Sequence, residues 1–138
     1  MTWVTIGLVT GMTEKPVLIP DSKHPITITP TDGRVTVTLG GRIVADTTRA
    51  LTLQEASYPA VQYVPLEDVD GAVLESNDTT TYCPFKGQAT YSSIRVGDDL
   101  AEAALWTYVD PHDSVSRIKG HAAFYPDRVD AIEVHPAG

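Results

Sequence analysis

Apolar and polar side chains alternate along much of this chain, and the alternation is clearest over residues 34–45. Within Arg34–Leu39 every second residue is apolar, and Arg42–Ala45 follows after the pair Gly40-Gly41. A period of two places successive side chains on opposite faces of an extended strand, so that one face is buried and the other is wet. Two glycines supply the positive φ angles that tight hairpin turns require. This stretch therefore predicts a β-hairpin.

Further short segments are typical of strands, because Val, Ile, Thr and aromatic residues are frequent in them and Gly, Pro, Asp or Asn separate them. They are Ile26–Thr29, Ala50–Gln54, Val61–Val64, Gln88–Val96, Trp106–Val109, His121–Phe124 and Ile132–Val134. This number of strands predicts a mostly β protein with an antiparallel sandwich-like or barrel-like fold.

Helix character is confined to Asp98–Leu105, which begins with N-cap-type residues and contains good helix formers. The segment runs directly into Trp106–Tyr108, which alternates like a strand. We therefore expect at most one short helix, or a turn, in the fold.

The length of the chain, 138 residues, suits a single compact domain. Thr13–His24 contains two prolines and charges of both signs, a composition typical of a loosely held segment. We expect a lead-in over residues 1–24 and one β-rich domain over residues 25–138.

The chain is acidic, with 18 Asp and Glu against 10 Lys and Arg and a net charge of -8. Binding to nucleic acids and to anionic membranes depends on clustered basic residues, so neither partner is expected. Met1–Gly11 is apolar, but it lacks the basic start of a signal peptide and the length of a membrane span. A single cysteine cannot form an internal disulfide, and the expected location is the cytoplasm.

Residues 79–91 bring together the sole cysteine, Cys83, with Lys86, a glycine and two tyrosines. An ammonium beside a thiol favours the thiolate, which is the reactive form of cysteine. A proline and a second turn residue, glycine, would shape a bend that exposes both Cys83 and Lys86. These two residues are the candidate catalytic residues.

A second interpretation makes Cys83 a small apolar residue that fills a gap in the core, since free cysteine is among the most buried residue types. A cysteine nucleophile would also need a base. His121 is the best candidate, but no spacing places it beside the thiol. Both interpretations stay open, and so does the question of whether the protein is an enzyme.

Basic and aromatic side chains could complete a pocket around this segment. Arg49 lies at a predicted strand start, where its guanidinium would clamp either Glu55 or an acidic ligand. Trp106 and Tyr108 share one face of a strand, where they form either an aromatic core or a pocket wall. The candidate ligand-binding residues are Arg49, Tyr63, Tyr82, Tyr91, Trp106 and Tyr108.

Five short blocks follow one another along the chain: Ala45–Leu51, Tyr63–Val69, Thr81–Gly87, Trp106–Tyr108 and Phe124–Pro126. Together they resemble the domain of unknown function family numbered 427, over about residues 25–134. The resemblance implies a small, mostly β protein of bacterial or fungal type, with a tent-like arrangement in which two antiparallel sheets meet at an angle. The family has no established activity, although its label suggests a nucleotidyltransferase.

The residues do not favour metal chemistry. A structural zinc site needs about four Cys or His ligands, whereas this chain has one cysteine and four scattered histidines. Related zinc-bearing tent families carry Cys-x-x-Cys pairs, and here the second position is Lys86. Nucleotidyl transfer would need metal-binding carboxylates near a glycine-led helix start, and the alternating pair Asp68-Val69-Asp70 is more typical of a loop. We expect no metal and no cofactor.

Two functions therefore remain. The first is a small-molecule binding or catalytic pocket around the Cys-Pro-Phe-Lys-Gly segment, whose ligand would be small and acidic or polar. The second is a noncatalytic β-module that binds a protein partner, or forms a homodimer, through an open sheet edge. A concave aromatic cavity that reaches both Cys83 and Lys86 would favour the first.

Overall fold

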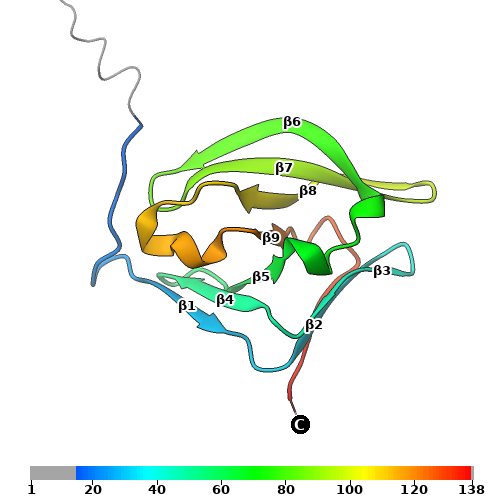
Figure 1. The fold of residues 1–138 in the computed structure, drawn as a ribbon, viewed down its shortest axis with the longest axis horizontal. Coiled ribbons are helices and arrows are strands. Elements are labelled where there is room, and N and C mark those ends of the chain that lie inside the picture. Colours follow the sequence, from blue (N-terminus) through cyan, green and yellow to red (C-terminus); the bar gives the residue numbers. More distant parts are fainter. Residues whose placement is uncertain (1–14, 138) are drawn as a thin grey trace, which may run out of the picture.

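The computed structural model describes residues 15–137, which form one mostly β domain (Figure 1). Its strands are β1 (Ile26–Pro30), β2 (Arg34–Leu39), β3 (Arg42–Thr47), β4 (Leu51–Glu55), β5 (Val61–Pro65), β6 (Leu74–Cys83), β7 (Gly87–Val96), β8 (Asp99–Tyr108), β9 (His121–Phe124) and β10 (Ala131–His135). Seven of them form one antiparallel sheet in the order β1-β4-β5-β9-β8-β7-β6, and three form a second sheet in the order β10-β2-β3. The predicted antiparallel β fold is confirmed.

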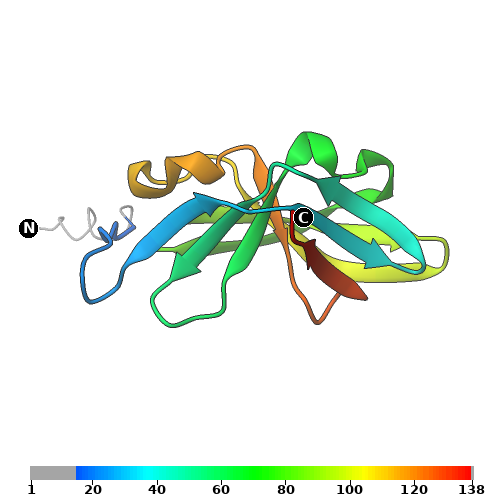
Figure 2. The ribbon, with the colours of Figure 1, turned by 90° about the horizontal axis from the view of Figure 1, so that it is seen from below.

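The predicted hairpin over residues 34–45 is also confirmed. β2 pairs with β3, and both turn residues have positive φ, 59° at Gly40 and 78° at Gly41. β10 pairs with the other side of β2, so the C-terminal strand, drawn in red, lies beside the cyan hairpin (Figure 2). These strands form the smaller of the two sheets.

The large sheet buries side chains on both of its faces. Along β5, Val64 lies in the core shared with the three-stranded sheet, whereas its neighbour Tyr63 lies in a second cluster. Along β9, Ala122 and Ala123 are divided in the same way. The second cluster is built from strands of the large sheet together with Val115 and Ile118 of the segment 113–118. Alternation along each central strand therefore supplies two separate cores.

The limit of at most one short helix agrees with the structure: Gly97, whose φ is 59°, and Asp98 form a turn, and the helix formers that follow belong to β8. β8 pairs with β7 on one side and β9 on the other, and this pairing outweighs a local helix preference. A register shift accompanies Ala103, whose φ is 49°. The bulge interrupts the alternation and hides the strand from a period-two search.

Strand β6 is absent from the sequence prediction because its composition carries no alternation. It forms an edge of the large sheet, opposite the edge formed by β1 (Figure 1). Most of its side chains are polar and exposed, and its pairing with β7 shifts between Asn77 and Thr80. An edge strand with one exposed face needs few apolar residues.

The helical segments among residues 15–137 are short 3-10 turns: η1 (Leu66–Asp68), η2 (Gly71–Val73) and η3 (Asp113–Ile118). η3 buries Val115 and Ile118 in the second cluster and covers one opening of the curled sheet (Figure 1). In the described part of the chain no helix has the length and apolar character needed to cross a bilayer.

The described part of the lead-in contacts the turn between β6 and β7. The N–H of Leu18 donates to the carbonyl of Pro84 at 2.9 Å, and the hydroxyl of Tyr82 donates to the carbonyl of Pro16 at 2.6 Å. The prediction for Met1–Gly11 concerns residues outside the described range.

The contact between Gly33 and the C-terminal strand can be tested by substitution. A Cβ atom at Gly33 would lie 2.1 Å from the carbonyl oxygen of His135, whereas one at Gly41 would meet nothing within 4 Å. Gly33→Ala should lower the free energy of unfolding by about 3 kcal/mol. Gly41→Ala should cost about 1 kcal/mol, the penalty for positive φ alone. Urea denaturation measures both, and equal losses would contradict the contact.

Candidate functional site

A cavity of about 170 Å³ opens among the aromatic residues of the second cluster. Five of the predicted site residues line it: Tyr63, Lys86, Tyr91, Trp106 and Tyr108. β5, β7 and β8 supply the four aromatic residues, and the turn before β7 supplies the lysine. Trp106 and Tyr108 face the same cavity, as expected for residues two apart on a strand. We call this space the tyrosine cavity.

Trp106 organises the aromatic wall. Its indole Nε1 donates to the hydroxyl of Tyr63 at 3.3 Å, and the two rings meet edge to face at 89°. The ring of Tyr125 packs against the indole with centroids 4.5 Å apart and stacks on Tyr91. The hydroxyl of Tyr91 hydrogen-bonds to those of Thr81, at 2.9 Å, and Tyr125, at 3.2 Å. These contacts fix the rings in place.

An ion pair lies at the polar end of the tyrosine cavity. The ammonium of Lys86 donates to Oε1 of Glu55, and His24 Nε2 lies 2.7 Å from Oε2 of the same carboxylate. The side chains of Lys86 and Glu55 are only 11% and 15% exposed. Burial by itself would raise the pKa of Glu55, but the hydrogen bonds from Lys86 and His24 outweigh it and lower that pKa.

A strained turn places Glu55 beside the aromatic residues. Ala56 follows it with a φ of 47°, a conformation that costs a residue other than glycine about 1 kcal/mol. The N–H of Ala56 donates to the carbonyl of Pro25 at 2.8 Å, and that of Tyr58 donates to the carbonyl of Glu55 at 2.9 Å. The turn thus directs both Glu55 and Tyr58 to the tyrosine cavity.

Two buried phenols leave hydrogen-bonding capacity unused. Tyr108 is 6% exposed, and within residues 15–137 its hydroxyl has no hydrogen-bond partner. Tyr63 is 1% exposed and accepts from Trp106, but in the same part of the chain no acceptor receives its own proton. Burial raises the pKa of both hydroxyls, so they stay protonated donors at physiological pH. Buried polar groups without partners are rare in folded proteins.

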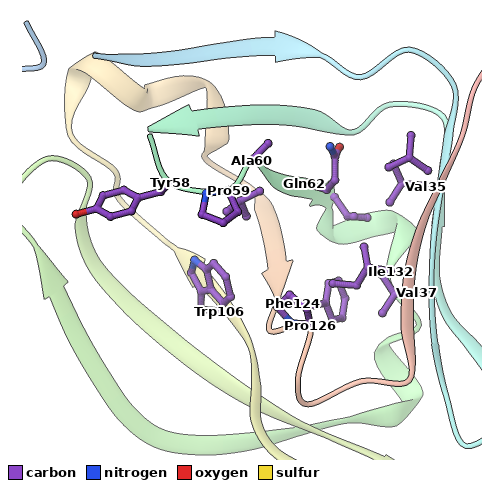
Figure 3. A pocket seen from close by; sticks show the side chains of 13 residues that line it. Val35, Val37, Tyr58, Pro59, Ala60, Gln62, Trp106, Phe124, Pro126 and Ile132 are labelled. Atoms are coloured by element: carbon purple, nitrogen blue, oxygen red, sulfur yellow. The ribbon is translucent and has the colours of Figure 1, made fainter. Parts of the chain in front are cut away.

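A larger apolar groove of about 570 Å³ shares part of its lining with the tyrosine cavity. Figure 3 shows Trp106, Tyr58 and Pro59 toward one end of it and side chains of the small sheet, Val35, Val37 and Ile132, toward the other. Its floor includes fully buried residues, Val35 and Val37 among them. Both spaces share four lining residues: Tyr58, Pro59, Val61 and Trp106. We call the larger space the apolar groove.

Cys83 does not line the tyrosine cavity, although it lies close to it in the chain. It ends β6, is half-buried and packs against the second cluster. A turn joins it to Lys86, whose N–H donates to the carbonyl of Cys83 at 3.1 Å. The expectation that this turn exposes Lys86 is wrong, because the ammonium turns inward to Glu55. Tyr82 lies outside the cavity as well, with its hydroxyl 3.1 Å from Nε2 of His112.

Arg49 lies apart from both spaces and is 58% exposed. Its guanidinium pairs with Glu67 at 2.9 Å and Asp68 at 3.2 Å, so the pairing with Glu55, one of the two alternatives for this residue, is wrong. Asp70 accepts from Arg42 and from the N–H of Ala72. The carboxylates of the Asp68-Val69-Asp70 segment are thus held by protein groups. Over residues 15–137 no three His, Cys, Asp or Glu side chains gather where they could hold a metal ion.

The sequence prediction missed four residues of the site: His24, Glu55 in this role, Tyr58 and Tyr125. A signal for Glu55 was present, because Leu51, Leu53 and Glu55 share one face of a strand by the period of two. Leu53 is buried, so this face of the strand points inward, and the carboxylate of Glu55 lies on the same face. Nothing in the spacing indicates that Glu55 meets a lysine 31 residues further on.

The pair formed by Lys86 and Glu55 should stabilise the fold. Glu55→Gln leaves the ammonium partly buried without a counter-charge and should cost about 2 kcal/mol, less than in a fully enclosed pair. The double variant Glu55→Gln/Lys86→Met removes the unpaired charge and should recover more than half of the loss. Urea denaturation at pH 7 measures both. A double variant less stable than Glu55→Gln would contradict the pair's proposed role.

The lowered pKa of Glu55 also predicts how the stability of the Glu55→Gln variant depends on pH. Because the folded-state pKa of Glu55 is lowered, its ionised form stabilises the fold above the ordinary carboxyl pKa, and this contribution is lost as the pH falls through the lowered value. The stability difference between the natural protein and Glu55→Gln should therefore shrink in acid. A difference that stays constant from neutral pH to acid would contradict the linkage.

Comparison with known proteins identifies the family of this chain. The profile of a domain of unknown function, DUF427, matches residues 27–135 and so covers most of the sequence. No curated protein matches the chain. The five sequence blocks that resemble this family all lie within the matched range. The chain belongs to the family of the domain of unknown function DUF427.

Proposed function

We propose that the protein binds a small molecule in the tyrosine cavity, where a polar group of the ligand accepts hydrogen bonds. One observation carries the proposal: Tyr108 lines the cavity, is only 6% exposed, and its hydroxyl has no hydrogen-bond partner within the described residues. A ligand acceptor at this point would satisfy it. Concave, mostly aromatic cavities with a few polar groups are also typical of ligand sites.

Three side chains would hold the polar group of the ligand. Tyr63 and Tyr108 each offer an O–H, and Lys86 offers the N–H groups that Glu55 does not use. Trp106 and Tyr91 would form the walls. In this proposal Lys86 anchors the ligand and does not attack it, because the ammonium is held by a carboxylate.

The remaining candidates have other roles in this proposal. Cys83 and Tyr82 support the turn that contains Lys86. Arg49 stabilises the segment after β5 through its ion pairs with acidic residues there. Binding without a covalent step is thus the function that we infer. The acidic composition and the lone cysteine support a cytoplasmic location and no nucleic-acid partner.

A second candidate function is a noncatalytic interaction module or homodimer. One observation favours it: Val17, Leu18 and Ile19 are consecutive apolar residues that are 55%, 46% and 70% exposed. They lie beside the turn between β6 and β7, at an edge of the large sheet. Apolar residues clustered on a surface can mark an interface. This function leaves the free hydroxyl of Tyr108 unexplained, so we place it second.

The unpaired phenol can be tested without any ligand. Tyr108→Phe removes a hydroxyl that bonds to no described residue, so the free energy of unfolding should change by less than about 0.5 kcal/mol or rise. Tyr82→Phe is the matched control, since it removes hydrogen bonds to Pro16 and His112 and should cost about 1 kcal/mol. A larger loss for Tyr108→Phe would show that its hydroxyl has a protein partner.

Binding itself can be measured through Trp106. The chain has two tryptophans, and Trp3→Phe leaves Trp106 as the only indole. A fragment screen with small aromatic ketones, amides and carboxylates should change its fluorescence and raise the melting temperature. Tyr108→Phe should lower the affinity for each bound fragment about fivefold to tenfold, which corresponds to the loss of one hydrogen bond. Absence of any hit at millimolar concentration would count against the proposed function.

A further inference from the structure

We infer that the ligand is a single molecule with an apolar body and an uncharged head group that accepts hydrogen bonds, such as a ketone, ester or amide carbonyl. The inference rests on the proposed function and adds the chemical class of the ligand. The head would lie in the tyrosine cavity and the body in the apolar groove.

The requirement for an acceptor follows from what the tyrosine cavity leaves unpaired. The hydroxyls of Tyr63 and Tyr108 remain protonated, and Lys86 carries only N–H groups. Both oxygens of the Glu55 carboxylate are already engaged, one by Lys86 and the other by His24. A donor head group would bond to a hydroxyl oxygen and leave the protons of Tyr63 and Tyr108 unpaired, whereas a carbonyl oxygen would accept from both hydroxyls.

The requirement for zero charge follows from the ion pair. Lys86 and Glu55 compensate each other inside the site, so a carboxylate ligand would bring a second negative charge beside Glu55 and lose its hydration. A cationic ligand would compete with Lys86 for the same carboxylate. Arg128 does not change this balance. It lies on the ring of Tyr125 and donates to backbone carbonyls, outside the residues that line the cavity.

The requirement for an apolar body follows from the lining residues that the two spaces share. Four residues line both spaces: Tyr58, Pro59, Val61 and Trp106. Ala60 lines only the apolar groove. Figure 3 shows Trp106 and Pro59 at the end of the groove that faces Tyr58. A carbonyl held in the tyrosine cavity would therefore direct its substituent along Trp106 toward the groove, where apolar side chains exclude water.

Four matched probes test the head group: naphthyl methyl ketone, naphthoate, ethylnaphthalene and naphthylmethylamine, all substituted at the same ring position. Ligand-observed NMR at pH 7 should rank the ketone tightest, at least about fivefold over the ethyl compound and about tenfold over either charged compound. If naphthoate, the amine or the ethyl compound binds as tightly as the ketone, the inference is overturned while the proposed function stands. If no probe binds, the proposed function fails.

Two variants test the placement of the body. Ala60→Phe fills the apolar groove from an exposed position, so it should lower the affinity for the naphthyl ketone at least about tenfold. Acetophenone is small enough to bind in the tyrosine cavity alone, and its affinity should change by less than about twofold. Ala72→Phe, an exposed alanine away from both spaces, is the matched control and should affect neither probe. Equal effects of Ala60→Phe on the two ketones would overturn the assignment of the groove to the ligand body.

Discussion

The register of the central strands is the constraint on which this structure depends. β5, β8 and β9 each bury both faces, so neighbouring residues in one strand belong to different cores. A shift of one residue would exchange Tyr63 with Val64 and place a phenol in the aliphatic core. The aliphatic layer between the sheets and the aromatic walls of the cavity are therefore set by the same ladder of backbone hydrogen bonds. Stability and the shape of the site cannot be separated here.

Alternation and glycine turns were sufficient to predict most of this fold. The hairpin of β2 and β3 follows from its own residues, because both its pairing and its turn are local. β8 and β6 do not, for opposite reasons: β8 contains good helix formers and a bulge at Ala103, and β6 is a polar edge. These segments are extended because they pair with other strands, and the local sequence does not indicate those partners.

The site was predictable in its aromatic part and unpredictable in its charged part. Trp106 and Tyr108 reveal their shared face by spacing, since the strand imposes it. The pairing of Lys86 with Glu55, and of Arg49 with Glu67, depends on how distant turns meet. The thiol of Cys83 was expected beside an ammonium, but the ammonium is bound to Glu55. The ammonium therefore gives no support to an activated thiol, and the nucleotidyltransferase label of the family remains a name.

Trp106 is a wall common to both spaces, and this arrangement separates the positions that can change recognition independently from those that cannot. Replacing the indole would reshape both spaces at once and remove its hydrogen bond to Tyr63. Tyr108 and Ile132 each border one space only. A substitution at either of these single-sided positions would therefore reshape one space and leave the other as it is, whereas none at Trp106 could.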